Sequence, residues 1–117
     1  MTDAYIYGAT RTPIGKQGGV LSETRADELA AETLESLAER ADIDPADVED
    51  VVMGCVTQVD EQGINIGRVA ALIAGYPVTT TGTTVNRMCG SSLQAVNFAA
   101  QGVMSGMHEM VVGAGVE

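Results

Sequence analysis

The chain is poor in the residues that hold metals or recognise nucleotides. Its 117 residues include two cysteines, one histidine and no tryptophan, and aromatic residues make up only 3%. Two cysteines and one histidine give no metal-ligand spacing, so we expect no metal site. Neither a Walker pattern nor a GxGxxG pattern occurs, so nothing points to a site for ATP or a dinucleotide.

Positive charge is also scarce. The chain has 6 basic residues against 16 acidic ones, for a formal net charge of −10, and Lys16 is its one lysine. This balance argues against nucleic acid or an anionic membrane as a partner. The acidic excess has two interpretations, which are adaptation to high salt and an ordinary solvated acidic surface.

Long hydrophobic runs are missing as well. The longest apolar runs are too short and too often interrupted by glycine to span a bilayer, and no secretory segment is recognisable. We therefore expect a protein of the reducing cytoplasm in which both thiols, Cys55 and Cys89, are free. Cys55 falls within an apolar run, which predicts a place in the core.

The apolar patterns alternate between strands and helices. Runs rich in β-branched or aromatic residues predict strands at residues 4–7, 48–56, 79–86 and 110–114. Helical spacing of apolar residues predicts helices at residues 26–41, 66–74 and 93–104. The order βαβαβαβ predicts an α/β fold with a mostly parallel sheet and right-handed crossovers. Because the last helix is apolar on most faces, we expect it to be buried.

Cys89 lies between the predicted strand at 79–86 and the predicted helix at 93–104. Unpaired N–H groups and the positive end of the dipole at a helix start favour a thiolate, which attacks thioesters and other acyl groups. The residues after the cysteine are small, so backbone N–H groups can approach a developing oxyanion. The alternative is a buried cysteine that packs as a small hydrophobic residue.

The sequence around this cysteine resembles the acyl-accepting motif of the thiolases, especially the 3-ketoacyl-CoA thiolases. The motif is NRMCGSS at residues 86–92. Further segments similar to thiolase segments follow in the family's order, at residues 9–16, 51–56, 65–71 and 111–117. The resemblance covers the whole chain and implies a thiolase-like fold. Residues 1–117 would form part of its N-terminal domain, without the loop domain and the C-terminal half, as a fragment or as a natural truncation.

The resemblance implies an acyltransferase, either a 3-ketoacyl-CoA thiolase or an acetyl-CoA acetyltransferase. Cys89 would carry the acyl group during thiolysis of a 3-ketoacyl-CoA or condensation of acetyl-CoA, with coenzyme A and acyl-CoA as substrates and no bound cofactor. In thiolases the acid, base and oxyanion-binding groups are a histidine, a second cysteine and an asparagine-bound water, and all of them come from later parts of the fold. His108 and Cys55 do not match those motifs, so we expect residues 1–117 alone to be inactive.

The resemblance also implies a homodimer or homotetramer. In thiolases the strand before the nucleophile pairs with its copy across a two-fold axis, and here that strand corresponds to residues 82–86. Asn86 and Arg87 are then expected to hold the turn that leads to the nucleophile.

Two alternatives to a catalytic thiolase stay open. One is a ketoacyl synthase-type condensing enzyme, and the other is a truncated non-catalytic thiolase paralogue that acts as an interaction module.

Overall fold

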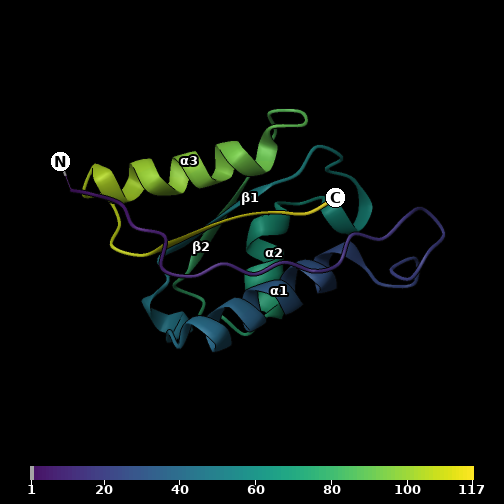
Figure 1. Ribbon diagram of the computed structural model, residues 1–117, viewed down its shortest axis with the longest axis horizontal. Helices are drawn as coiled ribbons and strands as arrows, with labels where there is room; N and C mark the ends of the chain where they lie inside the picture. The colour runs from purple at the N-terminus through teal and green to yellow at the C-terminus, as the bar shows by residue number, and fades with distance from the viewer. Residues whose placement is uncertain (1) are drawn as a thin grey trace.

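The computed structural model describes residues 2–117, which form a three-stranded parallel sheet with helices on both faces (Figure 1). The strands are β1 (Asp50–Gly54), β2 (Thr81–Val85) and β3 (Val111–Gly115), in the sheet order β2-β1-β3. The helices are α1 (Ala26–Ala41), α2 (Ile66–Ile73) and α3 (Ser91–Met104), with short 3₁₀ helices η1 (Pro45–Asp47) and η2 (Asp60–Gln62). The predicted α/β class and parallel pairing are confirmed.

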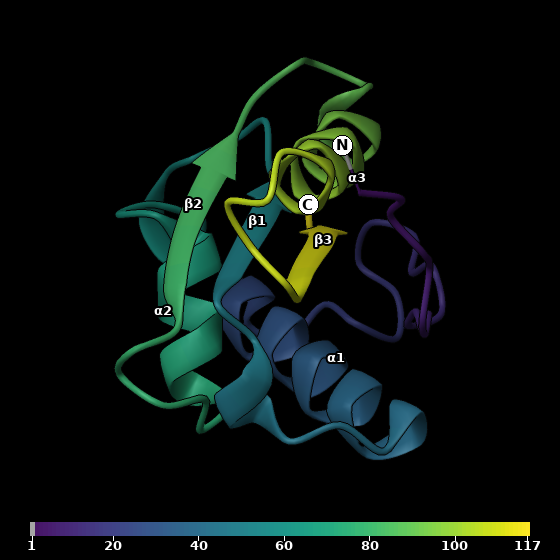
Figure 2. The ribbon, with the colours of Figure 1, turned by 90° about the vertical axis from the view of Figure 1, so that its left-hand side faces the viewer.

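The three long helices divide between the two faces of the sheet. Helix α3 packs against β1 and β3 on one face, whereas α2 packs against β1 and β2 on the other. Helix α1 lies against α2 on that second face (Figures 1 and 2). No helix among residues 2–117 combines the length and the apolar character that a membrane crossing requires.

The hydrophobic core lies between the sheet and the pair α1 and α2. Strand β1 is the central strand. Its residues from Val51 onward are buried, because a strand lies on each side of it and helices cover both of its faces. One buried cluster includes Leu34 of α1 and Ile66 of α2 together with Val51 and Met53 of this strand. Burial of each of these aliphatic side chains stabilises the fold by roughly 1.5–3 kcal/mol.

The predicted strand at residues 4–7 does not form. The side chains of residues 5–7 are 72–86% exposed, and the segment runs on the β3 side of the sheet (Figure 2). A backbone hydrogen bond of 3.2 Å from Thr2 N–H to the Met104 carbonyl holds its beginning near the end of α3. Strand preference depends on packing against neighbouring side chains, and residues 2–117 offer these aromatic residues no such surface.

The expectation that the last helix is buried on most faces is also wrong. Helix α3 buries only Ser91, Ala95 and Ala99, while Leu93 is 68% and Phe98 is 43% exposed. The small buried residues face the sheet, and the larger apolar ones face away from it. Within residues 2–117 no other helix or strand packs extensively against that outer face.

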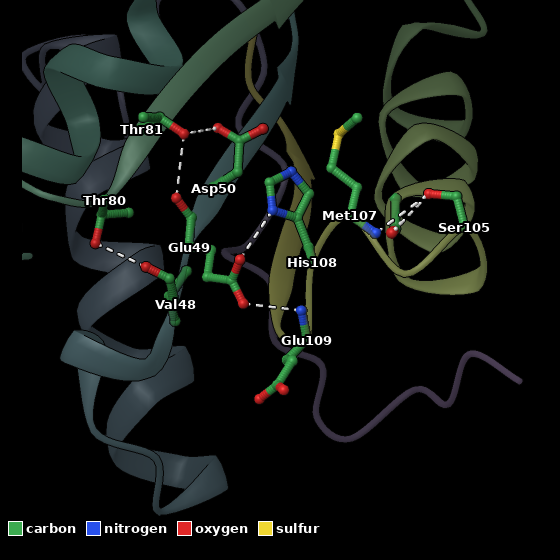
Figure 3. Close-up of polar contacts among 10 residues, drawn as sticks. Val48, Glu49, Asp50, Thr80, Thr81, Ser105, Met107, His108 and Glu109 are labelled. Atoms are coloured by element: carbon green, nitrogen blue, oxygen red, sulfur yellow. Dashed lines mark hydrogen bonds and ion pairs between the residues drawn. The ribbon is translucent and has the colours of Figure 1, made fainter. Parts of the chain in front are cut away.

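Glu49 links the amino ends of β1 and β3 (Figure 3). Its Oε1 accepts a 2.8 Å hydrogen bond from Glu109 N–H, and its Oε2 lies 3.0 Å from His108 Nδ1. The Glu109 N–H and then the His108 ring hold the pKa of Glu49 below its ordinary value of 4.5. The carboxylate form of Glu49 is therefore the one that the fold prefers.

Substitution Glu49→Gln is expected to lower the free energy of unfolding at pH 7. Since folding lowers the pKa of Glu49, its carboxylate stabilises the fold above about pH 4.5, and this contribution is lost as the pH falls through the folded-state value. Urea unfolding across this pH range should show the variant and the natural protein converging on acidification. Glu109→Gln is the matched control, because the Glu109 side chain makes no hydrogen bond within residues 2–117. A difference that does not change with pH would contradict the prediction.

Candidate active site

The carboxyl ends of the three parallel strands meet at one edge of the sheet, and Cys89 lies at that edge. Gly54 at the end of β1 is in register with Val85 of β2 and with Gly115 of β3. Cys89 lies in the short connection between Val85 and the start of α3. Ligand sites of open α/β sheets lie outside this edge, so the cysteine occupies the place where a substrate is expected.

The structure gives the two thiols different environments. Cys89 is exposed, whereas Cys55 is 1% exposed within the hydrophobic core. Burial, and after it the carboxylate of Glu117, raises the pKa of the Cys55 thiol, which keeps this thiol protonated and unreactive at neutral pH. The predicted core position of Cys55 is confirmed, and the buried-packing alternative for Cys89 is wrong.

Cys89 directly precedes the amino end of α3. Gly90 is the N-cap residue of this helix, and among residues 2–117 no side chain caps it. The Ser91 N–H donates to the Met88 carbonyl at 3.1 Å, and Cys89 lies next to the positive end of the helix dipole. The positive end of a helix dipole stabilises negative charge that develops beside it, such as that of an oxyanion.

Hydrogen bonds fold the residues around Cys89 into a tight turn. Gly90 N–H donates to the Arg87 carbonyl at 3.0 Å, and Met88 N–H donates to Asn86 Oδ1 at 2.9 Å. The Asn86 amide also donates to the Val56 carbonyl at 3.4 Å, in the loop after β1. Asn86 therefore holds the turn, as predicted. Arg87 contributes through its backbone, and its side chain makes no hydrogen bond within residues 2–117.

Ser91 is a part of this turn that the sequence did not reveal. It is 5% exposed, and its Oγ accepts a 2.9 Å hydrogen bond from Arg87 N–H and donates one of 2.6 Å to the Met88 carbonyl. In the sequence this serine stands out only as one of the small residues after the cysteine. The available signal was a hydroxyl at the start of a helix, where serine often bonds to nearby backbone groups.

Glycines on the sheet bring α3 close to the strands. A Cβ atom at Gly54 would lie 2.5 Å from the Ser91 carbonyl carbon and from Ser92 N, and one at Gly113 would lie 2.7 Å from Val96 Cα. Real Cβ atoms do not approach other atoms so closely. The helix backbone thus rests directly on the strands, and the first turn of α3 has a fixed position relative to β1.

The loop after β1 is fixed from the end of β3. The Glu117 carboxylate accepts hydrogen bonds of 2.9 Å from both Val56 N–H and Thr57 N–H. The Val56 N–H, followed by weaker contributions from Thr57, lowers the pKa of Glu117 despite its partial burial. Because this loop also binds the Asn86 amide, Glu117 supports the turn that carries Cys89.

His108 is not at this site. It lies beside Glu49, at the amino end of the strands (Figure 3), whereas Cys89 follows the carboxyl end of β2. Five residues of strand separate these edges by about 16 Å. Within residues 2–117 no histidine is near Cys89, and no cluster of three potential metal ligands exists. The described site therefore has an exposed thiol without an adjacent histidine.

Comparison with known proteins identifies the family. The family model described as "Thiolase, N-terminal domain" matches residues 4–117, so the chain belongs to the thiolase family. It is 47% identical over 117 residues to a steroid 3-ketoacyl-CoA thiolase of Mycobacterium tuberculosis, covering 100% of this chain and 29% of that protein. It is 44% identical over 118 residues to the 3-oxoadipyl-CoA/3-oxo-5,6-dehydrosuberyl-CoA thiolase of Escherichia coli, with coverage of 100% and 29%.

A solved structure confirms the predicted thiolase-like fold. The acetyl-CoA acetyltransferase of Bacillus anthracis superimposes with a TM-score of 0.95 at 39% sequence identity, covering 100% of this chain and 29% of that one. The chain thus spans less than a third of the length of the curated relatives it matches.

Proposed function

We propose that the whole protein containing this chain is an acyl-transferring thiolase and that Cys89 is its nucleophile. The observation that carries the proposal is the exposed Cys89 at the carboxyl edge of the sheet, directly before the uncapped amino end of α3. The names of the relatives, which include 3-ketoacyl-CoA thiolases, support the choice of acyl-CoA substrates.

In the cleavage direction the Cys89 thiolate attacks the 3-keto carbon of a 3-ketoacyl-CoA. The bond between C2 and C3 breaks, acetyl-CoA leaves as its enolate and takes up a proton, and the shortened acyl group remains on sulfur. The thiolate of coenzyme A then attacks this thioester and releases Cys89. The reverse sequence condenses two molecules of acetyl-CoA. Cleavage consumes a 3-ketoacyl-CoA and coenzyme A, condensation consumes acetyl-CoA and releases coenzyme A, and neither direction requires a bound cofactor.

Proton transfer in this scheme needs groups that residues 2–117 do not bring to Cys89. His108 lies at the other edge of the sheet, and Cys55 is buried. We propose that residues 1–117 are part of a thiolase N-terminal domain and that the acid and base groups belong to the remainder of a longer protein. Purified residues 1–117 should therefore show no thiolysis.

The assembly proposed for the whole protein is a homodimer, or a homotetramer built from such dimers. Strand β2 is an edge strand, so its outer side has no partner strand among residues 2–117. The Gly82 carbonyl accepts a 2.8 Å hydrogen bond from the Asn65 amide, and pairing with a second copy would cover this edge. A cytoplasmic setting suits the two free cysteines, and high salt in that setting would screen the net charge of −10.

Intact-mass measurement tests the proposal. The protein isolated from its natural source is measured before and after incubation with acetyl-CoA or acetoacetyl-CoA, and peptide mapping locates any added group. A long chain that gains one acetyl group on Cys89 is the expected result. A chain that stays unmodified would favour a non-catalytic paralogue. A chain that is acylated on Cys89 but does not transfer the acyl group to coenzyme A would favour another type of condensing enzyme.

A further inference from the structure

We propose that Ser91 is a positioning residue that orients Cys89 for attack by holding Met88 in a left-handed backbone conformation. The inference rests on the proposed function, because it concerns the geometry of that nucleophile. Ser91 itself touches neither the sulfur nor the proposed substrate. Its hydroxyl acts through the backbone of the turn that ends in Cys89.

The conformation of Met88 is unfavourable for its residue type. Its φ is +50°, in the left-handed region that glycine and asparagine occupy more readily than methionine does. The hydrogen bond from Gly90 N–H to the Arg87 carbonyl makes Met88 the first central residue of a four-residue turn. A positive φ at that position is the feature of type II′ turns, where glycine is usual. The surrounding contacts must therefore hold Met88 in place.

Two side chains supply these contacts from opposite ends of the turn, and the Ser91 N–H adds a 3.1 Å hydrogen bond to the Met88 carbonyl. Asn86 Oδ1 accepts from the N–H of Met88 at 2.9 Å, while Ser91 Oγ donates to the carbonyl of Met88 at 2.6 Å. The same Ser91 oxygen accepts from Arg87 N–H at 2.9 Å, so the hydroxyl bridges the backbone on both sides of Met88. The Met88 carbonyl belongs to the peptide group that joins Cys89, so fixing its orientation restricts the directions open to the cysteine side chain.

Ser91 is fixed to the sheet as well as to the turn. Ser91 is the first residue of α3 and is 5% exposed. Its backbone lies so close to Gly54 that a Cβ atom added to this glycine would be 2.5 Å from the Ser91 carbonyl carbon. The hydroxyl therefore connects the rigid end of β1 to the strained residue before the nucleophile. This rigid support is what distinguishes Ser91 from a hydroxyl that merely caps a loop.

The test uses the whole protein and compares Ser91→Ala with Ser92→Ala and Ser91→Thr. Ser91→Ala is expected to lower kcat for acetoacetyl-CoA thiolysis about tenfold or more, with KM changed less than about twofold, because orientation rather than binding is lost. Ser92→Ala removes a hydroxyl that makes no hydrogen bond within residues 2–117, so its kcat should stay within about twofold. Ser91→Thr keeps the hydroxyl and should recover most of the lost kcat.

A double-mutant comparison separates positioning from folding. Glycine accepts a positive φ without strain, so Met88→Gly removes the need for Ser91 to hold this residue. The loss caused by Ser91→Ala should shrink to about threefold or less in the Met88→Gly background. An equal loss in both backgrounds, or a loss that appears only in KM, would overturn the inference. Natural protein that is never acylated on Cys89 would instead overturn the proposed function.

Discussion

Substitution Cys89→Ala is expected to lower the rate of thiolysis by the whole protein at least about a thousandfold, because the acyl-enzyme can no longer form. KM for the acyl-CoA should change little, since binding energy comes from elsewhere on the substrate. The acetyl group seen by intact mass should disappear with the thiol. Steady-state kinetics with acetoacetyl-CoA and coenzyme A measure the first effect, and mass spectrometry measures the second.

Cys55→Ala is the matched control for this prediction. It removes the other thiol, which is 1% exposed and lies in the core rather than at the carboxyl edge of the sheet. The variant should keep its kcat and its acylation, and it should lose about 1 kcal/mol of stability through the small cavity it creates. Equal loss of activity in both variants would show that Cys89 has no special role in the chemistry.

Substitution Gly54→Ala is expected to destabilise the fold by more than about 3 kcal/mol and to abolish acylation of Cys89. The added methyl group would lie 2.5 Å from the backbone of Ser91 and Ser92. Backbone atoms of a helix cannot rotate away as a side chain can, so α3 must move away from β1. That movement displaces the turn that carries Cys89. Thermal and urea unfolding measure the stability, and acetyl-CoA labelling measures the site.

Gly90→Ala is the control for the stability measurement. A methyl group at Gly90 would meet only the Arg87 carbonyl oxygen, at 3.5 Å, and the φ of −98° is accessible to alanine. Its free energy of unfolding should stay within about 1 kcal/mol of the natural protein. If Gly54→Ala were as stable as Gly90→Ala, the close contact between α3 and β1 would not be a requirement of the fold.

The sequence predicted those elements whose residues find their partners within the chain. The spacing of apolar residues predicted helices at residues 26–41 and 66–74, and the structure has α1 at Ala26–Ala41 and α2 at Ile66–Ile73. The strand expected at residues 4–7 and the buried last helix failed for a shared reason. Both were inferred from apolar character. Apolar side chains favour burial, but they are buried only where another part of the structure packs against them. Residues 2–117 leave Tyr5 and Leu93 largely exposed.

The place of Cys89 in the fold was easier to predict than its support. Cys89 stands in a recognisable motif between a strand and a helix, so the sequence sufficed to place this cysteine before the start of α3. The role of Ser91 depends on which backbone groups a folded turn presents to its hydroxyl, and no periodicity encodes that. The role of Gly54 depends on the distance between a helix and a strand that are remote in sequence. Both contributions became visible only with the three-dimensional arrangement.

The close packing of α3 on Gly54 and Gly113 affects how this helix can move. Where a helix rests on side chains, rotamer changes and repacking allow it to slide and tilt by small amounts. At Gly54 and Gly113 the helix rests on backbone, which has no rotamers to change. The first turn of α3 should therefore fluctuate together with the sheet as one body. Thermal rearrangements in the core on the other face then reach the cysteine only by bending the sheet itself.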